Sequence, residues 1–304
     1  MAYRTNIVIW GYSARGVEVL EKVRQIEEYE FLGFVDNSMY KVGNFVCEKT
    51  IYSVAEICKL NKNQKISVIV AVGKWKEVEE ECKEKGIRIE AVYLEGELHR
   101  YPFPLFETLD YTEKIRFYAG DICDEIHKKM EGLYGLSLDR VDSRHIKHDV
   151  RNKYPILDNS IEAYEAEDVF EYIEKEKQID AINEIYRILK PGGYVRFTLP
   201  DYNSPYLKRR TMCSPTGEFL FDAVGGGTFG ENGISENGSI YFATYADFNT
   251  TLEQTMFSRI EWLCYYAEDG LLHKKYIDMD KGYVSRVSNE SDENVYCMVV
   301  DCYK

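Results

Sequence analysis

Three aspartates, each placed directly after a short apolar run, are the residues of this sequence that are best suited to binding. Asp121 follows IRFYAG, Asp139 follows LYGLSL and Asp149 follows HIKH. In a parallel α/β sheet, ligands bind in the crevice outside the carboxyl ends of the strands. We therefore predict a ligand site here, with Asp139 on a ribose diol, Asp149 on an adenine amino group and Gly120 allowing close backbone approach. Aspartate also commonly ends a strand, so a purely structural role stays open for each.

A second set of such residues lies near the start of the chain. GYSARG spells G-x-S-x-x-G after an apolar strand and at the start of a helix. Gly11 permits a tight turn, Gly16 permits close packing of helix on strand, and the helix N-terminus beyond Ser13 offers N–H donors to a phosphate. Asp36 follows Gly16 by 20 residues and can bind a ribose diol. The set predicts a nucleotide or nucleotide-sugar site, although any strand–helix turn favours glycine.

Alternating apolar runs and helical stripes predict the elements that position both sets. In the first block, strands are expected at 6–10, 31–35, 66–72 and 87–94, with helices at 15–28, 53–60 and 75–85. In the second, strands are expected at 115–120, up to Asp139, at 145–150, 160–165, 194–199, 259–266 and 294–303, with helices at 122–130, 177–190 and 245–256. Such alternation implies parallel sheets with right-handed crossovers. The fold class is therefore α/β, with two Rossmann-like doubly wound domains at 1–94 and 115–304 and a linker at 95–114.

Composition limits the partners. The 304 residues hold 38 Lys plus Arg against 52 Asp plus Glu, a net charge of −14. Binding to nucleic acid or to an anionic membrane rests on cationic side chains, so neither is expected. No apolar run approaches the length of a membrane span, and no leader peptide is evident. The eight Cys and five His have no metal-ligand spacing. We expect a cytoplasmic protein without a metal site.

The first block resembles a known domain. IVIWGYSARGVEVL, FLGFVDNS, IYSVAEI and SVIVAVG, within residues 5–94, are similar to the small Rossmann domain of bacterial sugar O-acyltransferases and of some sugar methyltransferases. The resemblance implies that Gly11, Ser13, Gly16 and Asp36 face a nucleotide-linked sugar.

The second block, residues 114–304, resembles the class I S-adenosylmethionine-dependent methyltransferases of the type 11 group, in a bacterial branch of predicted methyltransferases. HDVRNKYPILDNS and the helix that ends in RILKPGG carry this resemblance. It implies a seven-stranded sheet with a final antiparallel strand and S-adenosylmethionine as cofactor. The cofactor-binding residues that it implies are Gly120, Asp121, Asp139, Asp149, Val150 and Glu165. The first motif of this sequence, Tyr118-Ala119-Gly120-Asp121, keeps one glycine where the family commonly has three.

Methyl transfer to a hydroxyl or amine usually needs a general base. Candidates are Glu167, Asp168, His148 and Tyr202, each of which also suits a structural role. The glycine-rich segment 225–238 is a candidate substrate lid. The leading function is methylation of a small molecule, either a nucleotide-linked sugar or a surface-glycan precursor. A non-catalytic protein with a degenerate cofactor site and an NAD-dependent sugar-nucleotide enzyme stay open as alternatives, and so does a homodimer.

Overall fold

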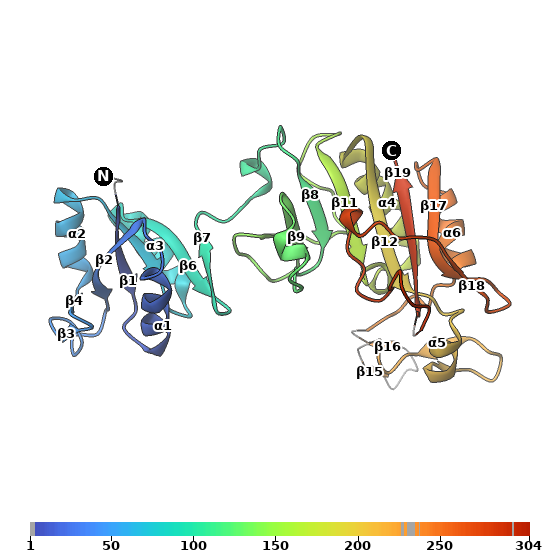
Figure 1. Cartoon of the computed structure of the whole chain (residues 1–304), viewed down its shortest axis with the longest axis horizontal. Coiled ribbons are helices and arrows are strands. Elements are labelled where there is room, and N and C mark those ends of the chain that lie inside the picture. The colour runs from blue at the N-terminus through green and yellow to red at the C-terminus, as the bar shows by residue number, and fades with distance from the viewer. Residues whose placement is uncertain (1–3, 226–227, 230–234, 237, 294) are drawn as a thin grey trace. The chain divides into compact units, whose positions relative to one another are not determined.

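The computed structural model describes residues 4–225, 228–229, 235–236, 238–293 and 295–304. They form two compact units, one up to Pro104 and one from Leu105 onward (Figure 1). Most of the candidate lid at 225–238 lies outside the described residues.

The first unit is a mostly parallel sheet with helices packed on it. Its strands follow the order β3-β4-β2-β1-β5-β6-β7. The elements in chain order are β1 (Thr5–Trp10), α1 (Ala14–Val23), β2 (Tyr29–Val35), β3 (Phe45–Val46), β4 (Lys49–Tyr52), α2 (Val54–Asn63), β5 (Ile66–Val70), α3 (Trp75–Lys85), β6 (Arg88–Leu94) and β7 (Glu97–Arg100). Ser53 caps α2 in a capping box with Glu56, and Gly86 ends α3 in the left-handed conformation.

The segment 95–114, expected as a linker, is shared between the two units. β7 pairs antiparallel with β6 through a two-residue loop, Glu95-Gly96, in which both residues have positive φ. Such a loop favours a tight hairpin. Further on, Phe106 is buried in the core of the second unit.

The second unit contains an eight-stranded sheet of order β10-β9-β8-β11-β12-β19-β17-β18. Its main elements are β8 (Arg116–Ala119), β9 (Leu133–Ser137), β10 (His145–Lys147), β11 (Ile161–Glu167), α4 (Lys175–Ile188), β12 (Leu189–Pro200), α5 (Pro205–Arg210), α6 (Tyr245–Glu253), β17 (Arg259–Tyr266), β18 (Leu272–Lys274) and β19 (Cys297–Tyr303). Short elements complete it: η1 (Phe106–Thr108), η2 (His127–Lys129), η3 (Phe170–Tyr172), η4 (Met279–Lys281), β13 (Met212–Cys213), β14 (Phe219–Phe221), β15 (Thr228–Phe229) and β16 (Ser235–Glu236).

The first five strands of this sheet, from β10 to β12, are parallel, whereas β19 is antiparallel to both β12 and β17. The predicted α/β class with a final antiparallel strand is confirmed. The sheet has one strand more than the seven expected, because β18 folds back on β17 as a short hairpin.

The predicted helix at 122–130 is replaced by the three-residue η2. The Asp124 carboxylate accepts the main-chain N–H groups of Ile126 and His127, at 2.9 and 2.8 Å, and also contacts the His127 ring. An aspartate that bonds to the backbone ahead of it favours a turn over a helix.

The two faces of the second sheet are covered differently. α4 and α6 pack on one face, over a core that includes Phe197 and Phe248. The segment after β18 crosses the other face, where Arg196 of β12 donates to the carbonyl oxygens of Asp278 and Gly282. No helix in the described part of the chain has the length and apolarity that crossing a membrane requires.

Candidate cofactor site

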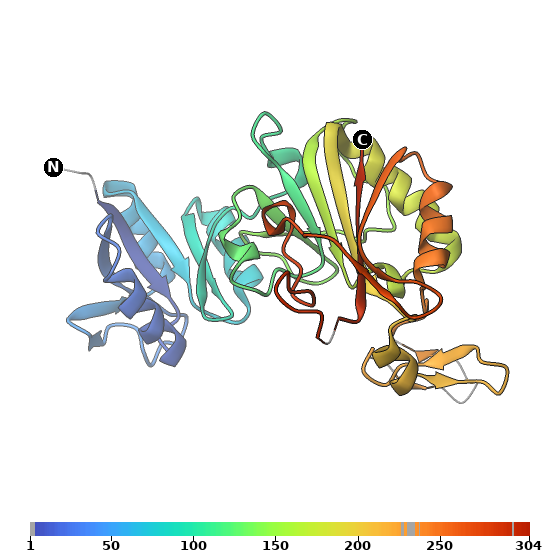
Figure 2. The ribbon, with the colours of Figure 1, turned by 45° about the vertical axis from the view of Figure 1, so that its right-hand side comes forward.

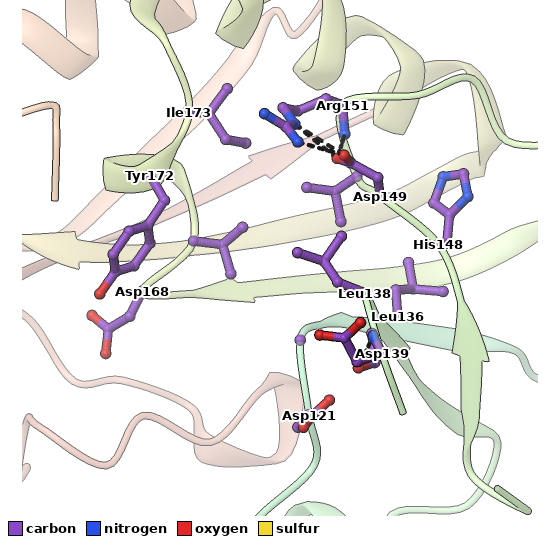
Figure 3. Close-up of a pocket in the computed structure, with 14 residues that line it drawn as sticks. Asp121, Leu136, Leu138, Asp139, His148, Asp149, Arg151, Asp168, Tyr172 and Ile173 are labelled. Carbon is purple, nitrogen blue, oxygen red and sulfur yellow. Dashed lines mark hydrogen bonds and ion pairs between the residues drawn. The ribbon is translucent and has the colours of Figure 1, made fainter. Parts of the chain in front are cut away.

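The carboxyl ends of β8, β9, β10 and β11 meet at one edge of the second sheet and enclose a pocket of about 440 Å³ (Figure 3). Five of the six residues expected to bind the cofactor line it, as do two of the four candidate bases. They are Gly120, Asp121, Asp139, Asp149, Val150, His148 and Asp168. Residues from four separate stretches of sequence are therefore brought to one cavity.

Glycine is required on both sides of the first loop. Gly120 has a φ of +106°, and a Cβ added there would meet no atom nearer than Tyr118 Cε1 at 3.8 Å. A Cβ at Gly135, in β9, would lie 2.8 Å from the Gly120 oxygen and 2.4 Å from Cδ2 of His145. The loop after β8 therefore packs directly on β9 and β10, and Gly135 supports this loop although the sequence analysis did not single it out.

His145, in β10, was also missed. Its Nδ1 lies 2.8 Å from Oδ1 of Asp142, and its Nε2 accepts the Ile122 N–H at 2.9 Å. With Nε2 as acceptor, Nδ1 carries the proton and donates it to Asp142. Burial alone would raise the pKa of Asp142, but hydrogen bonds from His145, from the Arg144 N–H and from Arg140 hold it well below its usual range. The spacing Asp-x-x-His was the available signal.

The acidic residues of the pocket differ in their partners. Asp121 and Asp139 are exposed, and neither carboxylate forms an ion pair within the described residues. The Asp149 carboxylate instead accepts the Arg151 Nη2 at 2.6 Å and Nε at 2.9 Å, drawn as dashed lines in Figure 3. These bonds lower the pKa of Asp149. Asp121 and Asp139 are thus free to bind a ligand, whereas the expected adenine contact of Asp149 competes with Arg151.

Asp168 closes the pocket on the β11 side, near Tyr172 (Figure 3). Its φ of +53° is unusual for a residue other than glycine. The Arg286 guanidinium holds its carboxylate with N–O distances of 2.9 and 2.5 Å. Burial raises the pKa of Asp168 to about 6, with Glu167 acting in the same direction and Arg286 opposing it.

Glu165, Glu167 and Tyr202 do not line the pocket, which corrects their expected placement. Side chains alternate along a strand, so Glu165 and Glu167 lie on the opposite face from the buried Tyr164. Glu165 accepts from Nε2 of His127 at 3.0 Å, and Glu167 accepts the Ser285 hydroxyl at 3.1 Å. Tyr202 is fully buried and donates to Asp222 at 3.1 Å.

The two motifs that carry the methyltransferase resemblance meet in the structure, where they fix a loop. Arg187 donates to the carbonyl oxygens of Tyr154 and Ile156, both at 2.9 Å, and pairs with Asp158 at 2.7 Å and with Glu184 at 2.7 Å. This loop leads from Asp149 and Val150 into β11. The role of Arg187 is therefore to hold the chain beside the pocket.

In the first unit, the four predicted nucleotide residues come together where β1 and β2 end. A Cβ at Gly16 would lie 2.0 Å from the Gly11 oxygen, and Ser13 caps α1. The Asp36 carboxylate accepts the N–H groups of Tyr12 and Ser38, at 3.1 and 2.9 Å, and pairs with Lys41 at 2.9 Å. All four residues thus have structural partners, and the charge of Asp36 is balanced by Lys41.

Comparison with known proteins gives one family match. Residues 106–197 match the family described as Methyltransferase domain. No curated protein matches the chain.

Similar solved structures include an S-adenosylmethionine-dependent methyltransferase from Thermotoga maritima, with 14% identity over 63% of this chain and 82% of that one and a TM-score of 0.39. Another, from Archaeoglobus fulgidus, has 14% identity over 64% and 88% and a TM-score of 0.38. UDP-D-quinovosamine 4-dehydrogenase from Vibrio fischeri has 20% identity over 29% and 75% and a TM-score of 0.26.

The family match covers β8 to β11 and most of β12, the part of the sheet whose carboxyl edge forms the pocket. The predictions of an S-adenosylmethionine-dependent methyltransferase and of S-adenosylmethionine as its cofactor are thereby confirmed. The match begins after the end of the first unit, so it supports no assignment for that unit.

Proposed function

We propose that this methyltransferase holds its cofactor in the pocket at the carboxyl ends of β8 to β11 and methylates a nucleotide-linked sugar or a surface-glycan precursor. The observation that carries the cofactor assignment is the convergence of Gly120, Asp121, Asp139 and Val150 on one cavity of about 440 Å³. This volume falls within the range typical of small-molecule sites.

The apolar side of the pocket fits an adenine ring. Leu138 lines the cavity with 58% of its surface exposed, and Val150 and Ile173 add further apolar surface. A flat ring inserted between these side chains would remove that surface from water. Asp139, next to Leu138, then offers its carboxylate to the two ribose hydroxyls, because one carboxylate accepts two hydrogen bonds.

The charge of the pocket also fits the cofactor. S-adenosylmethionine carries a positive sulfur and a positive ammonium group, and the exposed carboxylates of Asp121 and Asp139 attract such groups. The same carboxylates would repel the pyrophosphate of NAD. In the first unit, Lys41 occupies the Asp36 carboxylate that NAD would need for its ribose. Both observations weigh against the alternative of an NAD-dependent enzyme.

When bound, the cofactor supplies an electrophilic methyl group, so the protein's task is to align the acceptor and take up its proton. Asp168 is the residue that we assign as general base. It lines the pocket, and the Arg286 ion pair fixes its orientation. A pKa of about 6 leaves this carboxylate mostly ionised at neutral pH and still more basic than an ordinary aspartate.

Titration calorimetry with S-adenosylmethionine and S-adenosylhomocysteine tests the cofactor assignment. We expect both to bind and Asp139→Ala to weaken binding at least about tenfold, because two ribose hydrogen bonds are lost. Asp180→Ala, at an exposed position of α4, is the matched control and should bind normally. Absence of heat at millimolar ligand with folded protein would refute the assignment, and heat with NAD alone would favour the nicotinamide alternative.

A further inference from the structure

A cluster of cations lies on α5, which follows β12 after the turn at 201–204. Lys208, Arg209 and Arg210 are consecutive, in a chain whose net charge is −14. Lys208 and Arg209 are exposed, and in the described part of the chain their side chains form no hydrogen bond or ion pair. Arg210 pairs with Asp222 at 2.8 Å. Two exposed cations thus stand beside one that is held in place by an ion pair.

Aromatic rings accompany these cations. The Tyr206 and Tyr296 ring centroids are 5.6 Å apart with an interplanar angle of 34°. The Arg210 guanidinium lies 5.2 Å from the Tyr206 centroid and 5.8 Å from that of Tyr296. Tyr206 keeps 43% of its surface exposed. The exposed part of the Tyr206 ring, on the same short helix as the exposed Lys208 and Arg209, suits a ligand that combines a flat ring with phosphate groups.

Direct contacts connect this cluster to the cofactor pocket. Arg286, which holds Asp168 at the pocket wall, lies 5.4 Å from the Tyr296 centroid. Tyr296 therefore has the α5 cation Arg210 and the Asp168 partner Arg286 on its ring. Both views of the ribbon place α5 beyond the carboxyl end of β12 (Figures 1 and 2).

The turn that leads into α5 is rigidly held. The Asp201 carboxylate is fully buried and accepts the N–H groups of Tyr266 and Asn203, at 2.7 and 3.0 Å. The position of the cations relative to the sheet is thereby set by the fold.

We propose that Lys208 and Arg209 bind the phosphate or diphosphate group of the methyl acceptor and that Tyr206 stacks on its base or sugar. The proposal rests on the proposed function, since it names the acceptor that the enzyme would take. The cofactor pocket carries exposed carboxylates at Asp121 and Asp139, so an anionic group of the acceptor needs cations outside that pocket. The α5 cluster supplies them, and the path through Tyr296 and Arg286 leads from there to Asp168.

Two sources fit this chemistry, a nucleoside diphosphate and a sugar phosphate. Calorimetry on the full chain distinguishes them with uridine diphosphate, glucose 1-phosphate and pyrophosphate as probes, each measured in parallel with S-adenosylhomocysteine. The test variant is Lys208→Glu with Arg209→Glu. The matched control is Lys147→Glu with Lys275→Glu, which makes the same charge change at exposed positions in other parts of the unit. Circular dichroism checks that each variant is folded.

We expect saturable binding of pyrophosphate that falls at least about tenfold in the α5 variant and stays unchanged in the control, with S-adenosylhomocysteine affinity equal in all three proteins. Tyr206→Ala should weaken binding of uridine diphosphate more than that of pyrophosphate. Tighter binding of uridine diphosphate than of glucose 1-phosphate assigns a nucleotide-linked acceptor, and the reverse order assigns a sugar phosphate. If no probe binds, or if the α5 variant and the control bind alike, while S-adenosylhomocysteine still binds, the α5 proposal is overturned. If the unmodified chain itself does not bind S-adenosylhomocysteine, the proposed function is overturned instead.

Discussion

The imidazole of His145 accepts a hydrogen bond from the main-chain N–H of Ile122 at 2.9 Å. This bond joins β10 to the loop after β8, and Gly120 and Asp121 precede Ile122 directly. The other ring nitrogen is held by Asp142 at 2.8 Å, so the ring cannot turn without breaking two bonds. A buried histidine outside the pocket thus sets the position of the pocket's first loop.

Replacing His145 with Phe keeps a ring of similar size and removes the acceptor. The buried Ile122 N–H then loses its partner, and we expect the free energy of unfolding to fall by about 1–3 kcal/mol. Displacement of the loop should also weaken S-adenosylhomocysteine binding several-fold. Urea denaturation and calorimetry measure the two effects, with Lys147→Ala in the same strand as control. Unchanged cofactor affinity in the destabilised variant would contradict a role of His145 in positioning the loop.

Gly135→Ala should disrupt the same contact from the other side. The new methyl group would lie 2.8 Å from the Gly120 oxygen and 2.4 Å from the His145 ring. Overpacking of this kind lowers the free energy of unfolding by about 1–3 kcal/mol. Here the backbone that must move to make room includes the loop after β8, which lines the cofactor pocket. We expect a lower melting temperature together with a large loss of cofactor affinity. Gly73→Ala is a fair comparison, because its nearest neighbour, Arg15 Nη1, is 3.6 Å away. Equal behaviour of the two variants would show that the loop adapts freely.

The half-buried carboxyl of Asp168 makes stability depend on pH. Its pKa is about 6 in the folded protein and about 3.8 in the unfolded chain. The folded state therefore binds more protons between these values, and the contribution of protonated Asp168 to stability, fully present below pH 3.8, is lost as pH rises through about 6. Asp168→Asn removes this titration. We expect the stability of the variant relative to the unmodified protein to increase by about 2 kcal/mol from about pH 4 to about pH 7. Urea denaturation across this range measures it, and a constant difference would place the pKa of Asp168 in its ordinary range.

Arg187 should be hard to replace. Alanine would leave the carbonyl oxygens of Tyr154 and Ile156 without their donor and would break two ion pairs. We expect a loss of about 3 kcal/mol or more, and Arg187→Lys should recover only part of it because an ammonium group cannot reach all four partners. Denaturant unfolding measures the stabilities of the three proteins, which should fall from the unmodified chain through Arg187→Lys to Arg187→Ala. Lys177→Ala, on the exposed face of the same helix, should be nearly neutral.

Asp36→Ala tests whether Asp36 of the first unit has a structural role or binds a ligand. The substitution removes the acceptor of the Tyr12 and Ser38 N–H groups and the partner of Lys41. We expect destabilisation of about 1–3 kcal/mol, with S-adenosylhomocysteine binding unchanged. If the unmodified protein binds uridine diphosphate glucose and the variant, at unchanged stability, does not, Asp36 is instead a ligand-binding residue.

Elements that depend on local periodicity are predicted well from the sequence. β17 is found at the predicted residues, α3 likewise, and the acidic residues at the strand ends meet at one edge because parallel strands place them there. The missed residues depend on long-range contacts. Gly135 matters to the site only because Gly120 and His145 pack against it, and no local pattern indicates this. Glu165 was misplaced because a side chain's face depends on which residues of β11 meet α4, which a single strand's sequence leaves undetermined.

β19 lies between β12 and β17, so an interior strand of the second sheet is built from residues 297–303. Both of its neighbours, β12 and β17, precede it in the chain. Neither strand can form its hydrogen bonds on this side until β19 has been synthesised and has paired with it. The first unit has no such dependence, because all of its described strands precede residue 101. During synthesis from the N-terminus, the first unit can therefore finish folding while the second waits with an open gap in its sheet. A chain that stops before residue 297 would lack β19 and leave β12 and β17 as exposed edges prone to aggregation.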